Sequence, residues 1–234
     1  MRFARRLLRS AGLVLVAVVA SLAVLALVRW ATAPPPPALP AGFAVAPDAT
    51  ASQPELRAEL LRRVALDQAV REGSGAALSD LASLGGLWAF AGEALRMERI
   101  DRPNRRWVRA RVADGWPTAA DVGPDGLEAL FLLVQHADPE LQREALGPFQ
   151  AAWRRGELDG RSLALLTDRV LVGQGHPQRY GSQFQATLGT GMALYPIDDA
   201  GAVDARRAAM GLPPLAEYLD TACREIEVCV ELPS

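Results

Sequence analysis

Six polar side chains could carry chemistry in this chain, and they lie in three short segments beside apolar stretches. The segments span residues 135–138, 167–169 and 178–183. Polar groups next to buried elements are costly unless they pair with each other, with the backbone or with a ligand. We therefore predict one shared polar pocket, whose candidate residues are His136, Asp168, Arg169, Gln178, Tyr180 and Gln183.

Each of these residue types suggests a role in acid–base chemistry or in ligand binding. His136 is the candidate catalytic base, because an unperturbed histidine titrates near neutral pH, and Asp168 would orient it. Arg169 could bind a carboxylate or phosphate through two parallel hydrogen bonds. Directional hydrogen bonds to a polar substrate would come from Gln178, Tyr180 and Gln183. The pattern predicts a pocket for a small polar or anionic ligand, with a hydrolase-type reaction as its chemical use.

A non-enzymatic interpretation accounts for the same residues. His136 could cap helix carbonyls, Asp168 and Arg169 could form a structural ion pair, and Tyr180 could belong to the core. The protein would then be a protein-interaction or envelope-scaffold module. An open pocket lined by these side chains favours the first interpretation, and a closed, mutually satisfied network favours the second.

The residue types argue against a metal ion or a bound cofactor. His136 and Asp138 stand two positions apart, and such residues do not face the same way on a helix. The chain contains no lysine, which excludes a Schiff-base lysine and a phosphate-loop lysine. We expect no metal site and no cofactor.

Charge separates the first thirty residues from the rest of the chain. Those thirty residues hold five arginines and no acidic residue. The remainder therefore holds 20 basic and 27 acidic residues, a net charge of −7. A negative domain without a basic run is a poor nucleic-acid binder, so no nucleic-acid partner is expected.

The N-terminus predicts a membrane anchor. Arg2, Arg5, Arg6 and Arg9 precede an uncharged run over residues 10–28, and about 18–20 apolar residues nearly cross a hydrocarbon core of about 30 Å. The arginines favour a cytoplasmic N-terminus, which would place the domain in the periplasm or outside the cell, tethered to the inner membrane by a single pass. A cleaved signal peptide is the alternative. The expected organisation is a flank and anchor over 1–30, a proline-rich linker over 31–53 and one domain over 54–234.

The domain itself reads as mainly α-helical with a small β-hairpin. Apolar spacing, prolines and glycines predict the hairpin at 184–188 and 192–197 and a terminal strand at 226–230. Pro103 is expected to break or kink the helical pattern between 99 and 105. Helices are expected at 54–71, 87–99, 105–112, 127–135, 139–155, 162–172, 203–210 and 214–224. Asp138 is the expected N-cap of the 139–155 helix, and its expected buried stripe is Leu141, Ala145, Phe149, Ala152 and Trp153.

Cys223 and Cys229 are the two cysteines of the chain. Six positions apart on one continuous helix they would be about 9 Å apart, too far to bond. If the helix ends between them, an oxidising compartment permits a disulfide. Two free, buried thiols are the alternative.

Several short motifs, taken together, resemble an uncharacterised bacterial family. They are Gly115-Trp116-Pro117, Gln135-His136-Ala137-Asp138, Leu166-Thr167-Asp168-Arg169 and Gln178-Arg179-Tyr180-Gly181-Ser182-Gln183, and Asp204, Arg206, Arg207, Gly211, Leu212 and Tyr218 extend the match. The family usually has threonine where this chain has Ser182. The resemblance covers about residues 100–218 and implies a fold unit with a site, without a known reaction.

Overall fold

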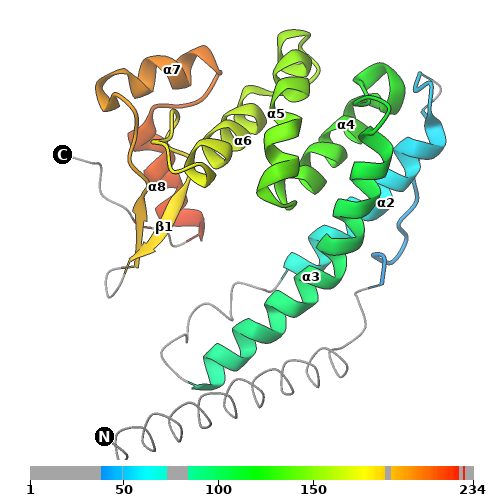
Figure 1. Cartoon of the computed structure of the whole chain (residues 1–234), viewed down its shortest axis with the longest axis horizontal. Coiled ribbons are helices and arrows are strands. Elements are labelled where there is room, and N and C mark those ends of the chain that lie inside the picture. The colour runs from blue at the N-terminus through cyan, green and yellow to red at the C-terminus, as the bar shows by residue number, and fades with distance from the viewer. Residues whose placement is uncertain (1–37, 49, 73–83, 188–190, 227–228, 230–234) are drawn as a thin grey trace, which may run out of the picture. The chain divides into compact units, whose positions relative to one another are not determined.

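The computed structural model describes residues 38–48, 50–72, 84–187, 191–226 and 229. In that part the protein is mainly α-helical with one antiparallel hairpin, as the sequence predicts (Figure 1). The elements are α2 (Pro54–Arg71), α3 (Leu84–Val112), α4 (Ala119–Gln135), α5 (Pro139–Arg154), α6 (Gly160–Gly173), β1 (Phe184–Thr187), β2 (Gly191–Leu194), a 3₁₀ turn η2 (Ala200–Ala202), α7 (Val203–Ala209) and α8 (Leu215–Ile226).

The described residues form two compact units, and α2 and α3 each contribute to both. The first unit contains residues 38–39, 66–72 and 84–100. Within it, Arg71 donates a 3.0 Å hydrogen bond to the buried Asp67 one turn earlier on α2. The second unit contains the remaining described residues, and every site discussed below lies in it.

The capping residues of α5 and α6 explain where these helices begin. Asp138 accepts a 3.1 Å hydrogen bond from the backbone N–H of Leu141, and Pro139 occupies the first turn. Asp159 accepts a 2.7 Å bond from the N–H of Ser162. Side-chain acceptors satisfy N–H groups that a helix start leaves unpaired. The predicted cap at Asp138 and the start of α5 at Pro139 are confirmed.

The main core of the second unit forms where α4, α5 and α6 meet. Leu130 and Val134 of α4, Leu141 and Phe149 of α5 and Leu166 of α6 are all buried in it. The predicted apolar stripe of α5 is observed, with Trp153 partly buried at its edge. Helices with such one-sided stripes are stable because packing removes that face from water.

The expected break at Pro103 was wrong. Helix α3 runs continuously from Leu84 to Val112 with Pro103 inside it. Ile100, Asn104 and Val108 are all buried, at a spacing of four residues on either side of the proline. Proline removes one backbone hydrogen bond, and burial of one continuous face outweighs that local cost.

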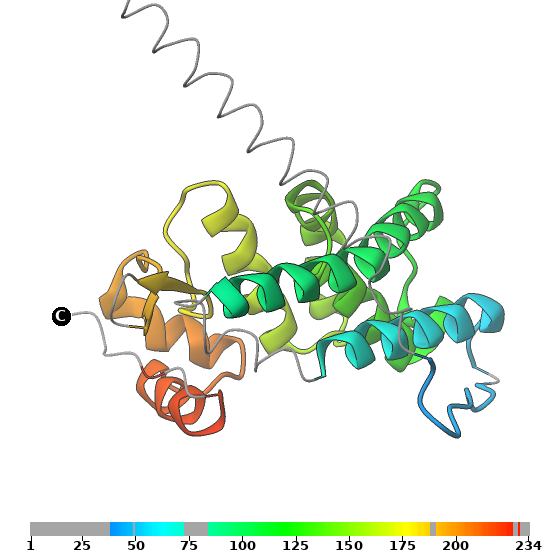
Figure 2. The same ribbon diagram turned by 90° about the horizontal axis from the view of Figure 1, so that it is seen from below.

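The hairpin lies against α8. Phe184 of β1 pairs with Leu194 of β2, and both pack against a small core that contains Leu215 and Leu219. The hairpin lies beside α8 in both views (Figures 1 and 2). The predicted hairpin is confirmed, with β1 one residue shorter than predicted and β2 shifted to begin at Gly191 and end at Leu194. The expected terminal strand at 226–230 falls mostly outside the described residues, and Ile226 is the last residue of α8.

The predicted membrane anchor and most of the proline-rich linker also lie outside the described residues. In the described ranges, no helix has the length and apolarity that crossing a bilayer requires. The anchor and the domain boundaries stay predictions.

Acid should weaken the start of α4 through Asp121. Its carboxylate accepts hydrogen bonds from the backbone N–H and hydroxyl of Thr118, both at 2.8 Å, and these bonds hold the pKa of Asp121 below its ordinary value. A lowered folded-state pKa contributes stability above the unfolded value of about 3.9, and that contribution is lost as pH falls through the folded value. We expect Asp121→Asn to lower the thermal midpoint at pH 7, and the difference from the wild type to shrink between about pH 4 and pH 2. A difference that stays constant with pH would contradict this role.

Candidate ligand-binding site

Asp168 organises the loop between α6 and β1. Its carboxylate is fully buried. It accepts hydrogen bonds from the N–H of Arg179 at 2.7 Å, of Tyr180 at 3.0 Å and of Ser182 at 3.0 Å, and from the Ser182 hydroxyl at 2.9 Å. A buried carboxylate with this many donors is well satisfied, and it fixes the backbone that supplies them. The structure therefore makes Asp168 a positioning residue for the loop.

Gln178 stabilises the same loop through hydrogen bonds of its buried side chain. It is fully buried, and its amide donates to the carbonyls of Gln183 at 3.1 Å and Tyr195 at 2.8 Å. Its own side-chain oxygen accepts the N–H of Gln183 at 2.8 Å. These bonds fasten the loop to the residues after β2. Gln178 therefore has a structural role, because its side-chain amide is already hydrogen-bonded to the backbone.

Two glycines allow the loop and the neighbouring helices to approach closely. Gly181 has φ +72°, which favours glycine, and a Cβ there would lie 2.7 Å from the side chain of Leu215. At the first position of α6, a Cβ on Gly160 would overlap the backbone carbonyl of Met210. The close approach of α6, the loop and the segment after α7 defines the walls of a cavity.

Arg207 of α7 connects the loop to the segment after α7. It is 2 % exposed, and it donates to the carbonyls of Tyr180 and Pro213, both at 2.6 Å. Its guanidinium carbon lies 4.8 Å from the ring centroid of Tyr218, a cation–π distance. Burial lowers the pKa of Arg207, and the guanidinium nevertheless remains charged, as arginine does throughout proteins. Its Nη2 group makes no hydrogen bond within the described residues.

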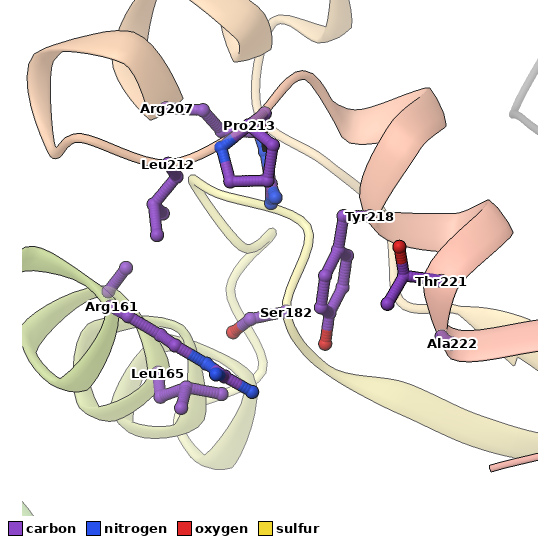
Figure 3. Close-up of a pocket in the computed structure, with 10 residues that line it drawn as sticks. Arg161, Leu165, Ser182, Arg207, Leu212, Pro213, Tyr218, Thr221 and Ala222 are labelled. Carbon is purple, nitrogen blue, oxygen red and sulfur yellow. Dashed lines mark hydrogen bonds between the residues drawn. The ribbon is translucent and has the colours of Figure 1, made fainter. Parts of the chain in front are cut away.

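The cavity beside Arg207 has a volume of about 400 Å³, and we call it the α6–α8 hollow. Five of its ten lining residues are apolar, among them Leu165 and Leu212, and five are polar (Figure 3). The lining residues are Arg161, Ala164, Leu165, Ser182, Arg207, Leu212, Pro213, Tyr218, Thr221 and Ala222. A concave site of this size with a few convergent polar groups is typical of small-molecule binding.

Two arginines line the hollow although the domain carries a net negative charge. Arg161 makes no ion pair or hydrogen bond with any described residue, and none of the ten lining residues is acidic. Its guanidinium extends toward the hydroxyls of Ser182 and Tyr218 (Figure 3). Burial raises the pKa of Tyr218, so its hydroxyl stays protonated and can donate a hydrogen bond at neutral pH. The arrangement suits an anionic group.

The predicted site residues separate into different places. His136 caps the end of α4, where its N–H bonds the carbonyl of Leu132 at 3.3 Å, and it does not line the hollow. The side chain of Tyr180 packs against the main core. The hydrogen bonds that Asp168 accepts come from the loop, and the catalytic roles assigned to His136 and Asp168 stay predictions.

Arg169 and Gln183 do meet at a cavity, although it is a different one. Arg169 donates through Nη1 to the carbonyl of Gln135, at the end of α4. Gln142 of α5 donates to the same carbonyl at 3.0 Å. A second cavity of about 310 Å³ is lined by these two side chains and by Gln183.

Arg161 and Thr221 were missed by the sequence reasoning. Nothing in the local sequence around Arg161 marks it, since it stands on the first turn of α6 among ordinary surface residues. Arg207 and Tyr218 did carry a signal, because both belong to the motifs that resemble a known family. In the described residues, no group of three or more histidines, cysteines and acids is placed to hold a metal ion.

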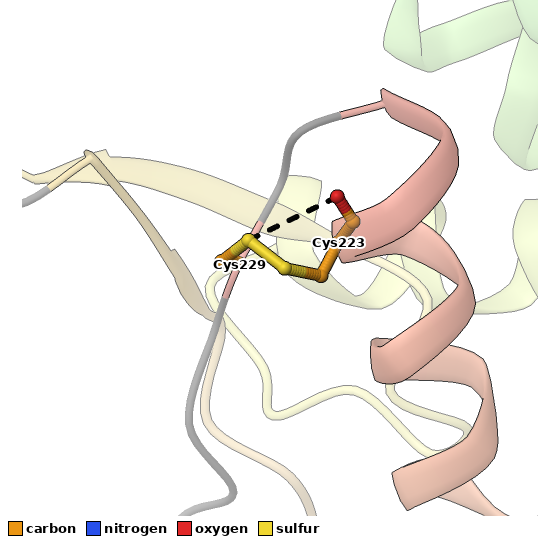
Figure 4. Close-up of a disulfide and its surroundings, with 2 residues drawn as sticks. All are labelled: Cys223 and Cys229. Atoms are coloured by element: carbon orange, nitrogen blue, oxygen red, sulfur yellow. Dashed lines mark hydrogen bonds between the residues drawn. A yellow bond between two sulfur atoms is a disulfide. The ribbon is translucent and has the colours of Figure 1, made fainter.

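Cys223 and Cys229 form a disulfide beside the hollow (Figure 4). Their Cα atoms lie 4.2 Å apart, because Cys223 is near the end of α8 and Cys229 follows after the helix has ended. Thr221 and Ala222, the residues just before Cys223, line the hollow. The covalent link therefore fastens the end of the helix that forms this wall.

Comparison with known proteins identifies a family to which no activity is assigned. A family model described as a family of unknown function, DUF6624, matches residues 54–227. No curated protein and no solved structure matches the chain. The function has to be argued from the site.

Proposed function

Because the chain belongs to the DUF6624 family of unknown function, we propose its function from the geometry of the α6–α8 hollow: it binds a small organic anion with an apolar body. The observation that carries the proposal is that Arg161 and Arg207 line one cavity without a lining carboxylate. Guanidinium groups are matched to carboxylate or phosphate oxygens, and Arg161 makes no ion pair or hydrogen bond with a described residue. Leu165 and Leu212 would contact the apolar part of the ligand.

The proposal is binding rather than catalysis. Ser182 lines the hollow, but its hydroxyl already donates to Asp168 and accepts from the amide of Gln183 at 3.2 Å. His136, the predicted base, does not line it. A general base must lie within hydrogen-bond reach of the proton that it removes.

Three probes test the charge requirement on the full-length chain. Phenyl phosphate and benzoate carry an anion on an apolar ring, and benzyl alcohol is a neutral molecule of similar shape. We expect saturable binding of at least one anion by isothermal titration calorimetry, and none of benzyl alcohol. Binding of benzyl alcohol as tight as that of the anions would overturn the proposal.

Arg161→Gln tests the location. The variant removes the exposed cation of the hollow, and we expect it to weaken anion binding at least about tenfold, which corresponds to about 1.4 kcal/mol. Arg154→Gln, an exposed arginine of α5 outside the hollow, is the matched control and should bind as the wild type does. Equal affinities for the two variants would place the anion elsewhere.

The cellular setting is part of the proposal. An N-terminal anchor would hold the domain outside the cytoplasm, and the Cys223–Cys229 disulfide supports an oxidising compartment. A reporter enzyme fused to the C-terminus, active only outside the cytoplasm, tests this address. Activity of a cytoplasm-dependent reporter would overturn it. The scaffold alternative gains support if no anionic probe binds.

A further inference from the structure

The second cavity is lined in part by the same loop, through Gln174 and Gln183. It has a volume of about 310 Å³ between α5, α6 and the start of the hairpin. Its polar lining consists of Gln142, Arg143, Arg169, Gln174, Gln183 and Tyr195, without an acidic residue. Ser182 lines the α6–α8 hollow and Gln183 lines the second cavity. The two cavities share no lining residue, so they are separate sites.

Two arginines supply positive charge to the second cavity. Arg143 is exposed and makes no ion pair or hydrogen bond with the described residues. Arg169 is held in place by its bond to the carbonyl of Gln135. Because an anchored guanidinium and an unengaged one line the same cavity, they can bind an anionic group at a small cost in side-chain ordering.

The glutamines supply hydrogen-bond acceptors beside these cations. Gln142 is 6 % exposed, and its amide nitrogen donates to the carbonyls of Gln135 and Ala137, both at 3.0 Å. The amide nitrogen of Gln183 is engaged with the carbonyl and hydroxyl of Ser182. Neither side-chain oxygen accepts a hydrogen bond from a described residue, and the amide of Gln174 makes none. A ligand that uses these oxygens must carry donors.

We infer that the second cavity binds a phosphorylated sugar or polyol. The phosphate would pair with Arg143 and Arg169, and its hydroxyls would donate to the amide oxygens of Gln142, Gln174 and Gln183. The ligand differs from the one proposed for the hollow, because three glutamine side chains line the second cavity and none lines the hollow. The inference stands whether or not the hollow binds an anion.

Calorimetric titration of the full-length chain with glucose 6-phosphate, inorganic phosphate and glucose tests the ligand class. We expect glucose 6-phosphate to bind at least about tenfold more tightly than phosphate, because hydroxyl contacts add to the ionic ones, and glucose not to bind. Equal affinity for phosphate and glucose 6-phosphate would overturn the assignment to a sugar or polyol. Absence of glucose 6-phosphate binding would overturn the site.

Matched variants separate this site from the hollow. Arg143→Gln, which changes an exposed residue, should weaken glucose 6-phosphate binding at least about tenfold. Arg161→Gln should leave that binding unchanged, and Arg143→Gln should leave phenyl phosphate binding unchanged. If Arg161→Gln abolishes glucose 6-phosphate binding while Arg143→Gln does not, the sugar phosphate sits in the hollow and the inference fails.

Discussion

Asp168→Asn should destabilise the protein by about 3–5 kcal/mol, which corresponds to two or three buried donors left without an acceptor. The carboxylate accepts from three backbone N–H groups and the Ser182 hydroxyl. An asparagine keeps one acceptor oxygen and presents an NH₂ group to donors, so it cannot satisfy them. Urea unfolding followed by circular dichroism measures the change in free energy.

Asp220→Asn is the control for Asp168→Asn. Asp220 is exposed on α8 and makes no hydrogen bond or ion pair with a described residue, so its replacement should change stability by less than about 0.5 kcal/mol. Similar losses for the two variants would show that the loop does not depend on the Asp168 carboxylate. Because the loop carries Ser182 and the Tyr180 carbonyl that holds Arg207, Asp168→Asn should also abolish anion binding in the hollow.

Phe149→Ala should cost about 3–5 kcal/mol, because it removes a large buried side chain and leaves a cavity. Phe149 is 1 % exposed at the centre of the α4–α5–α6 core. Its ring meets the rings of Phe131 and Trp116 edge to face, with centroids 5.6 and 5.8 Å apart. Such pairs add about 0.5–1.5 kcal/mol to the burial of the area. The same urea unfolding measures the loss.

Phe149→Leu distinguishes lost volume from lost ring contacts. Leucine refills much of the space without an aromatic face, so its cost should fall clearly below that of alanine. If Phe149→Leu lowers the free energy of unfolding as much as Phe149→Ala does, the loss comes from the ring contacts. A cost below about 1 kcal/mol for Phe149→Ala would contradict the central place of this side chain.

The local signals in the sequence predicted local structure well. Asp138 and Pro139 marked the start of α5, and the four-residue spacing of Leu141, Ala145 and Phe149 marked its buried face. These features depend on residues within one or two turns, so a linear sequence contains them. Pro103 shows the limit, because burial on both sides of it preserved a helix that local rules would end.

The candidate site shows the same difference between what local sequence and what tertiary packing determine. The sequence by itself determined that Asp168 and Gln178 had to find partners, because buried polar groups cannot remain unpaired. Only the tertiary structure decided that these partners are the backbone of the loop, and that Arg161 of α6 and Arg207 of α7 share one cavity. The physical reason is that residues 46 positions apart meet through helix packing, which depends on the whole core and leaves no mark in the residues beside Arg161.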